Sequence, residues 1–253
     1  MKKIISLTLL FFLAIGVQAQ DKNAAASERA YNAYKEGDYA TALSIYKKFI
    51  DEGYQAEISF STAISMLKFM DKNEEAIEMS SQAMEKFPES EMLLIQAINV
   101  RVIDPDYYEE AIQLLKKAIS GDKENVNFYY LLSSMYYNME RSEEAKPYLD
   151  KALKIDPNAY SPNYLYGTIY FEQGTDLAIK MNNVAISEHA LYDKYKEDMT
   201  KLYNKSLPYF LNAHEAQPDE TLPLEALMHI YMNVSEFEKF QEMKAKYNKL
   251  KAN

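Results

Sequence analysis

Residues 142–157 read SEEAKPYLDKALKIDP, and this stretch determines how the rest of the chain is interpreted. Two small residues, Ala145 and Ala152, stand seven positions apart, and Pro157 closes the segment. Glu143 and Glu144 lie near its start, where negative charge complements the dipole of a helix. The stretch therefore predicts a helix over residues 142–154 that ends before a proline.

The same pattern recurs along the chain: DYATALSIYKKFI from Asp38, NEEAIEMSSQAM from Asn73, YYEEAIQLLKKAI from Tyr107 and KSLPYFLNAHEAQP from Lys205. The first small positions lie 34, 35 and 34 residues apart, at Ala42, Ala76, Ala111 and Ala145. The second positions are Phe49, Ala83, Ala118, Ala152 and Ala213, and the last interval of 61 residues exceeds the repeat by 27. A fixed period of this length is typical of repeat proteins.

These residues resemble the tetratricopeptide repeat (TPR) family, whose motif has a large residue, Leu-Gly, a Tyr, two small residues and a closing Pro. The fourth unit matches best, with Leu132, Tyr136, Ala145, Ala152 and Pro157. The departures are that Gly at the eighth motif position occurs only as Gly167, that the third unit ends without proline, and that a sixth unit over 220–250 carries Phe240 at a small position. The resemblance implies an all-α fold, a right-handed α-α superhelix (TPR solenoid) of about five to six helical hairpins. It covers about nine tenths of the chain after the leader described below.

Small residues let two helices approach closely, and a single hairpin cannot bury its apolar stripe without stacked neighbours. We expect helices over 25–36, 39–51, 56–70, 73–86, 90–103, 107–119, 125–138, 142–154, 160–181, 187–216, 220–233 and 236–250. Turns are expected at Gly37-Asp38-Tyr39 and, with one extra residue, at 102–106.

An insertion of about residues 175–201 falls within the fifth repeat and is expected to lengthen both helices of that hairpin. Asn182-Asn183 is the predicted turn between them, and Pro208 predicts a kink or break near 204–208. Two roles stay open for the insertion. In the first role, which we favour, it packs back onto the solenoid as a structural addition of the family. In the second role it binds a partner or forms a homodimer.

The first 19 residues have the features of an export signal. Lys2 and Lys3 precede an apolar run over 4–17, and Val17-Gln18-Ala19 provides a cleavage site. An uncleaved membrane anchor is the alternative, although the run is shorter than a membrane span requires. We expect a signal peptide over 1–19, a TPR domain over 20–253 and no stable membrane insertion after cleavage. The expected location is the periplasm, with the extracellular medium as the alternative.

Composition excludes several other classes. Six glycines and eight prolines among 253 residues are too few for the turns of a β-sandwich, and no glycines cluster as in a nucleotide-binding fold. The net charge of −10 argues against nucleic acid and anionic membrane partners, which require basic residues. The absence of cysteine removes disulfides, thiol catalysis and a lipid anchor on cysteine.

A search for catalytic or metal-binding motifs finds none. The three histidines, His189, His214 and His229, do not form a metal-binding pair, because none has the HExxH spacing on one helix face. No nucleophile elbow or phosphate-binding loop is present. We expect a non-enzyme with no catalytic residue, no metal and no cofactor.

The remaining candidate is the concave groove that the family forms from the first helix of each hairpin. The resemblance places twelve predicted binding residues there: Tyr31, Tyr34, Asn99, Tyr130, Ser134, Tyr137, Asn138, Tyr164, Thr168, Phe171, His229 and Asn233. Ser65, Phe69 and Glu172 also occupy groove positions by the family's pattern. Tyrosines offer rigid contact area with a polar tip, which suits a protein or peptide partner. Ordinary packing between helices is the alternative for any one of them. The Lys/Asn/Arg carboxylate clamp of cytosolic TPR cochaperones is absent, since its positions include Ser27, Tyr31, Ile58 and Ser61. The expected function is an exported protein- or peptide-binding adaptor, and the alternative is a carbohydrate- or nutrient-binding accessory protein.

Overall fold

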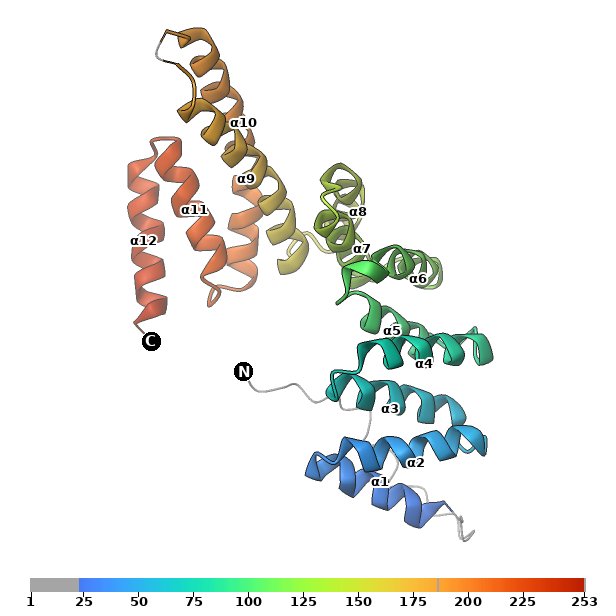
Figure 1. Ribbon diagram of the computed structural model, residues 1–253. Coiled ribbons are helices and arrows are strands. Elements are labelled where there is room, and N and C mark those ends of the chain that lie inside the picture. Colours follow the sequence, from blue (N-terminus) through green and yellow to red (C-terminus); the bar gives the residue numbers. More distant parts are fainter. Residues whose placement is uncertain (1–22, 186, 253) are drawn as a thin grey trace. The chain divides into compact units, whose positions relative to one another are not determined.

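The structure is a computed structural model that describes residues 23–185 and 187–252, so the predicted signal peptide lies outside the described residues (Figure 1). Within these ranges the chain forms twelve α-helices and one short 3-10 helix, with no β-strand. The all-α class predicted from the sequence is confirmed. The chain divides into two compact units, one up to Leu93 and one from Leu94, and each is described by itself.

The first unit is built from two helical hairpins, with the second helix of the first hairpin packed against the first helix of the next. Its helices are α1 (Ala24–Glu36), α2 (Tyr39–Asp51), α3 (Ala56–Phe69) and α4 (Asn73–Lys86). Gly37 turns the chain between α1 and α2 with a φ of 79°, and its N–H is bonded to the carbonyl of Tyr34 at 3.1 Å. The Asp38 carboxylate then accepts the N–H of Thr41 at 3.0 Å, which caps α2. The predicted turn at 37–39 is confirmed.

The second unit contains most of α5 (Glu91–Arg101), whose first residues belong to the first unit. Its other elements are the 3-10 helix η2 (Pro105–Tyr107), α6 (Tyr108–Gly121), α7 (Val126–Asn138), α8 (Ser142–Ile155), α9 (Tyr160–Asn182), α10 (His189–Ala216), α11 (Leu222–Asn233) and α12 (Phe237–Lys251). Every predicted helix is present, and the ends differ from the expected ones by at most two residues. None of the described helices is both long and apolar enough to span a bilayer.

The small residues of the repeat lie where helices touch. Ala42, Ala76, Ala111 and Ala145 are all completely buried, at 0% exposure. The residues at the second small position, Phe49, Ala83, Ala118, Ala152 and Ala213, are exposed by 6% or less. A larger side chain at the first position would hold the two helices of a hairpin apart, because core positions have no spare volume. The repeat spacing in the sequence is therefore the spacing of these helix contacts.

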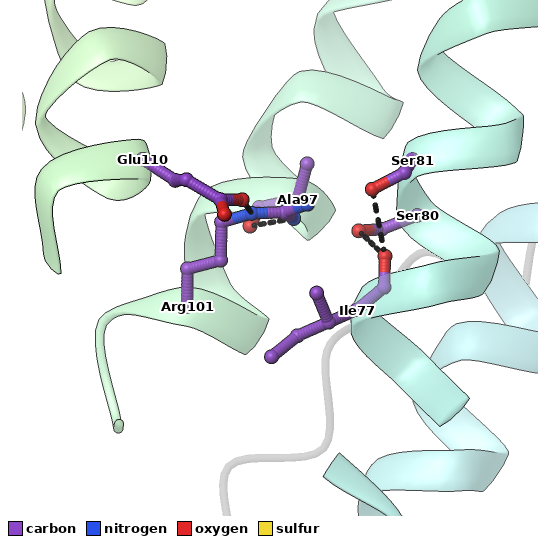
Figure 2. Close-up of polar contacts among 6 residues, drawn as sticks. All are labelled: Ile77, Ser80, Ser81, Ala97, Arg101 and Glu110. Atoms are coloured by element: carbon purple, nitrogen blue, oxygen red, sulfur yellow. Dashed lines mark hydrogen bonds and ion pairs between the residues drawn. The ribbon is translucent and has the colours of Figure 1, made fainter. Parts of the chain in front are cut away.

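Polar side chains fix two of the helix segments locally (Figure 2). Arg101 ends α5 and is only 5% exposed; its Nε donates to Glu110 Oε2 at 2.9 Å and its Nη1 to the Ala97 carbonyl at 3.1 Å. The bond to Glu110 attaches the last turn of α5 to α6, and the bond to Ala97 lies within α5. Within α4 of the first unit, the hydroxyls of Ser80 and Ser81 both donate to the Ile77 carbonyl.

The fifth hairpin has the elongated helices expected from the insertion, because α9 has 23 residues and α10 has 28. Two glycines of α9 face aromatic rings of α10. A Cβ at Gly174 would lie 2.7 Å from Cδ1 of Tyr203, and one at Gly167 would lie 3.0 Å from the Phe210 ring. The single Gly at the eighth motif position, Gly167, therefore lets α9 and α10 pack closely.

Of the kink or break predicted near Pro208, the break is wrong, because α10 runs without interruption from His189 to Ala216, and the kink stays a prediction. Proline removes one backbone donor from a helix, but the residues around it are held by packing. Tyr203 and Phe210, on either side of Pro208, are 0% and 1% exposed. Pro147 lies inside α8 in the same way. Tertiary packing thus overrides the local tendency of proline to end a helix.

Candidate binding face

The predicted binding residues all lie on the first helices of the hairpins, and they fall into both units. Tyr31 and Tyr34 lie on α1 of the first unit, and the other ten lie on α5, α7, α9 and α11 of the second. Asn99 is half-buried on α5.

In the first unit, Tyr34 takes part in a cluster of rings. Its ring centroid is 5.9 Å from that of Tyr39 and 6.1 Å from that of Phe69, and Tyr39 stacks on Phe69 at 5.1 Å. Tyr31 is 39% exposed, and Lys35 Nζ lies 5.5 Å from its ring centre. Tyr34 thus packs α1, α2 and α3 together, whereas Tyr31 offers a ring to solvent.

In the second unit, a hydrogen bond joins α7 to α9. The Tyr137 hydroxyl donates to Glu172 Oε1 at 2.6 Å. Burial raises the pKa of Tyr137 above its ordinary value, and the bond to Glu172 raises it further. Tyr130 and Ser134 are half-buried and lie two turns and one turn before Tyr137, respectively, on the same side of α7. Asn138 points to α6 instead, where its Nδ2 donates to the Tyr108 hydroxyl at 3.4 Å.

On α9, Tyr164 belongs to a stacked pair. The rings of Tyr160 and Tyr164 lie 5.8 Å apart and are tilted by 5°, and the edge of Phe210 meets Tyr164 from α10. Thr168 is half-buried and donates its hydroxyl to the Tyr164 carbonyl at 2.9 Å. Burial raises the pKa of Tyr160 to about 12, with the Glu220 carboxylate adding to the effect.

Phe171 and His229 contact each other across α9 and α11. Their ring centroids are 5.0 Å apart, and Tyr203 and Phe210 of α10 complete the group around Phe171. Burial lowers the pKa of His229 below its ordinary value of 6.5. Asn233 donates to the His229 carbonyl at 2.8 Å, one turn earlier on α11. Phe171 thus contributes mainly to the core, while His229 and Asn233 have exposed surfaces.

We call the surface shared by these helices the tyrosine face: Tyr130, Tyr137, Tyr160, Tyr164, Thr168, Glu172, Glu225 and His229, on α7, α9 and α11. The groove positions predicted from the sequence included Glu172 but lacked Tyr160 and Glu225. Both stand four residues before a named position, Tyr164 and His229, so helical spacing places them on the same side. That spacing is the signal by which they could have been found.

A second group of tyrosines belongs to packing between helices. Tyr136 of α7 stacks on Tyr148 of α8 at 5.6 Å, and Tyr166 of α9 stacks on Tyr209 of α10 at 4.4 Å. Cations lie over this group, with Arg141 Cζ 4.8 Å from the Tyr136 ring centre and Lys146 Nζ 5.0 Å from that of Tyr170. We call these residues the packing tyrosines: Tyr136, Tyr148, Tyr166, Tyr170 and Tyr209.

The described residues were compared with the side-chain clusters that hold metal ions. They contain no group of three or more histidine, aspartate or glutamate side chains placed to hold a metal ion. The first unit has two surface pockets, of about 450 and 290 Å³, and neither is lined by a predicted binding residue. His214 Nδ1 is buried without a hydrogen-bond partner, and burial lowers the pKa of this residue.

Comparisons with known proteins agree with the hairpin architecture. The family model of the tetratricopeptide repeat matches residues 106–165. A TPR repeat-containing protein of Methanocaldococcus jannaschii is 23% identical over 126 residues, which is 47% of this chain. The match covers 22% of that relative, so the chain spans about a fifth of its length.

Solved structures with this fold cover most of the chain. A tetratricopeptide repeat protein from Parabacteroides merdae has a TM-score of 0.59 at 14% identity, over 89% of this chain and 77% of that one. MamA from Desulfovibrio magneticus RS-1 has a TM-score of 0.56 at 15% identity, over 78% and 97%. YrrB, described as a TPR protein with an unusual peptide-binding site, has a TM-score of 0.54 at 20% identity, over 82% and 93%. At these identities the likeness shows the fold.

Proposed function

The chain contains tetratricopeptide repeats, and from this we propose that it is a non-catalytic adaptor that binds a protein or peptide. We place the binding residues on the tyrosine face of α7, α9 and α11. Repeat folds carry their function in surface chemistry, so the proposal rests on the side chains of this face.

The observation that carries the proposal is the set of tyrosine side chains on two successive first helices, α7 and α9. The stacked pair Tyr160 and Tyr164 and the bond from Tyr137 to Glu172 hold these side chains in place. A fixed ring loses little conformational entropy when a partner binds, which favours recognition. YrrB, a relative in fold, is described as having a peptide-binding site, which supports a peptide as the ligand class.

The test is site-specific photocrosslinking in the cells that make the protein. A benzophenone amino acid replaces Tyr130 on the tyrosine face, and the matched control carries it at Phe237, an exposed aromatic residue at the start of α12. The proposal predicts a defined protein adduct from position 130 and none from position 237, read by mass spectrometry. Equal adducts from both positions, or none from position 130, would contradict it.

The N-terminal residues of the chain bear on its domain limits and its location. We propose that residues 1–19 are a cleaved signal peptide, that residues 20–253 form the TPR domain, and that the protein resides in the periplasm. The charged start, the apolar run and the small residues at 17 and 19 support this. Fractionation of cells with N-terminal sequencing tests it: we expect a mature chain beginning at Gln20. A protein that is found in the cytoplasm and still begins at Met1 would overturn this proposal.

A carbohydrate or nutrient ligand remains the second candidate, favoured by the parallel rings of Tyr160 and Tyr164. Sugar rings pack on aromatic faces, but these two rings stack on each other, which leaves less free aromatic surface. A glycan array separates the two functions. Micromolar binding of a glycan that is abolished by Tyr130→Ala with Tyr137→Ala would favour the carbohydrate function.

A further inference from the structure

Charge differs between α7, α9 and α11, which carry the tyrosine face, and the second helices of the second unit. Among the described residues, α7 and α11 contain no lysine or arginine, and α9 contains only Lys180 near its end. The second helices carry the cations: Lys116, Lys117, Lys146, Lys151, Lys154, Lys194, Lys196, Lys201, Lys205, Lys239, Lys244, Lys246, Lys249 and Lys251. The charged side chains on and beside the tyrosine face are carboxylates, namely Glu172, Glu220 and Glu225.

These carboxylates have no ion-pair partner among the described residues. Several carboxylates of the second helices are paired, as in Glu197 with Lys201 at 2.7 Å and Glu242 with Lys246 at 2.9 Å. Among the described residues, Glu172 accepts a hydrogen bond from the neutral hydroxyl of Tyr137 alone. The negative charge of the tyrosine face is therefore not neutralised within the described part of the chain.

The aromatic rings of the face are free of cations as well. Within the described residues, the cations near rings of the second unit lie over Tyr129, Tyr136, Tyr148, Tyr170, Tyr231, Phe240 and Tyr247. None lies over Tyr130, Tyr137, Tyr160 or Tyr164. The charges that act on the Tyr164 hydroxyl belong to Glu225 and Glu172, which, with burial, raise its pKa. His229 adds no positive charge at neutral pH, since burial lowers its pKa.

We infer that the segment bound by the tyrosine face is cationic, with lysine or arginine side chains that pair with Glu172 and Glu225 and lie against Tyr160 and Tyr164. This inference rests on the proposed function and names the chemistry of its partner. Carboxylates and aromatic faces both attract ammonium and guanidinium groups. An acidic segment would be repelled by three carboxylates that have no ion-pair partner among the described residues. The face would therefore discriminate between cationic and acidic segments.

The test begins with an unbiased selection. The purified protein is used to select binders from a library of random peptides displayed on phage, and enriched peptides are synthesised with a fluorescent label. The inference predicts that lysine and arginine are enriched and that glutamate and aspartate are depleted. Anisotropy titrations then compare the protein with Glu172→Gln plus Glu225→Gln, which keeps side-chain size while removing two charges.

The matched control is Glu215→Gln plus Glu238→Gln, two exposed carboxylates on α10 and α12 with no ion pair among the described residues. Glu238 lies in the first turn of α12, as Glu225 does in α11. Both pairs change the net charge equally, so long-range attraction is the same. We expect Kd to rise about tenfold for the face pair, the effect of two partly exposed charge contacts, and less than about twofold for the control.

The outcomes separate the inference from the proposed function. Selected peptides that are neutral or acidic, yet lose affinity on Tyr130→Ala with Tyr160→Ala, would overturn the inference and keep the function. Cationic peptides weakened equally by both glutamine pairs would show diffuse attraction and would also overturn the inference. A selection with no peptide that depends on Tyr130 and Tyr160 would overturn both.

Discussion

At the residue scale, one turn position recurs in four hairpins with four different amino acids. Gly37, Asp71, Glu140 and Ser235 each link the two helices of a hairpin, and their φ angles lie between 57° and 79°. Only glycine adopts this left-handed conformation without a steric cost from Cβ. The turn of the repeat therefore requires the left-handed conformation at this position, and three of the four hairpins adopt it with a residue other than glycine.

Exchanging these turn residues should change stability in opposite directions. We expect Glu140→Gly to raise the free energy of unfolding by about 0.5–1 kcal/mol, because the strain at φ 60° is removed. Gly37→Ala should lower it by at least a similar amount, since φ there is 79°. Urea titrations followed by circular dichroism measure both. A loss of stability for Glu140→Gly would contradict this explanation of the turn.

Gly174 should be sensitive to a single methyl group. In Gly174→Ala the new Cβ would lie 2.7 Å from the buried Tyr203 ring, so we expect a loss of about 1–3 kcal/mol in the free energy of unfolding. Gly121→Ala is the control, because nothing lies within 4 Å of a Cβ there. It should leave stability unchanged or raise it. Equal effects of the two changes would mean that the contact between α9 and α10 is not close.

His214 should make stability depend on pH. Burial, together with Lys246, lowers its pKa below 6.5, although Glu215 acts in the opposite direction. As pH falls through 6.5, the unfolded chain therefore binds a proton before the folded chain does, and stability is lost. We expect a lower Tm at about pH 5.5 than at about pH 7.5. His214→Gln should reduce that difference, and an unchanged difference would exclude this residue as its source.

At the element scale, the helix ends followed closely from the sequence, because small residues, turn residues and the repeat period all mark the same boundaries. Pro208 was misjudged because its effect depends on how firmly α9 holds α10, which no local pattern reveals. Local sequence also does not reveal which aromatic residues pack in the core and which lie on the surface. Tyr164 and Phe171 lie two turns apart on the same side of α9. Phe171 nevertheless packs on Tyr203 and His229, and this depends on how α9, α10 and α11 are rotated relative to one another.

The elongated fifth hairpin has one packed side and one exposed side. Leu177, Ala178 and Met181 pack against the core cluster that contains Met199 and Tyr203. Ile179, Leu191 and Tyr192 are exposed by 56%, 36% and 40%. The packed side supports the proposal that the insertion stabilises the fold. The exposed apolar side chains support the alternative proposal that the insertion forms a homodimer.

Two substitutions separate these roles. Met181→Ser should lower the free energy of unfolding by about 2 kcal/mol or more if the insertion stabilises the fold, because apolar burial is lost. Ile179→Ser should leave stability unchanged. Sedimentation equilibrium then decides the second role: a dimer that dissociates on Ile179→Ser would assign dimerisation to the insertion, and a monomer throughout would exclude it.

At the scale of the whole molecule, repeat architecture was predictable because each hairpin repeats one contact pattern. The proposed binding surface was only partly predictable, because its net charge depends on the charged residues of three helices, α7, α9 and α11. No single segment shows that α7 and α11 lack cations while α8, α10 and α12 carry them. Tyr160 and Glu225 belong to the surface for this reason, and Asn138, which bonds to Tyr108 on α6, contributes less to it.

The most direct measurement uses the 22 tyrosines as probes. The protein is labelled with ¹³C at the tyrosine rings, assigned by substitution, and titrated with a selected cationic peptide while NMR spectra are recorded. The account predicts shifts for Tyr130, Tyr137, Tyr160 and Tyr164, with the packing tyrosines unchanged. Shifts centred on Tyr136, Tyr148, Tyr166, Tyr170 and Tyr209 would contradict the claim that the tyrosine face is the binding site.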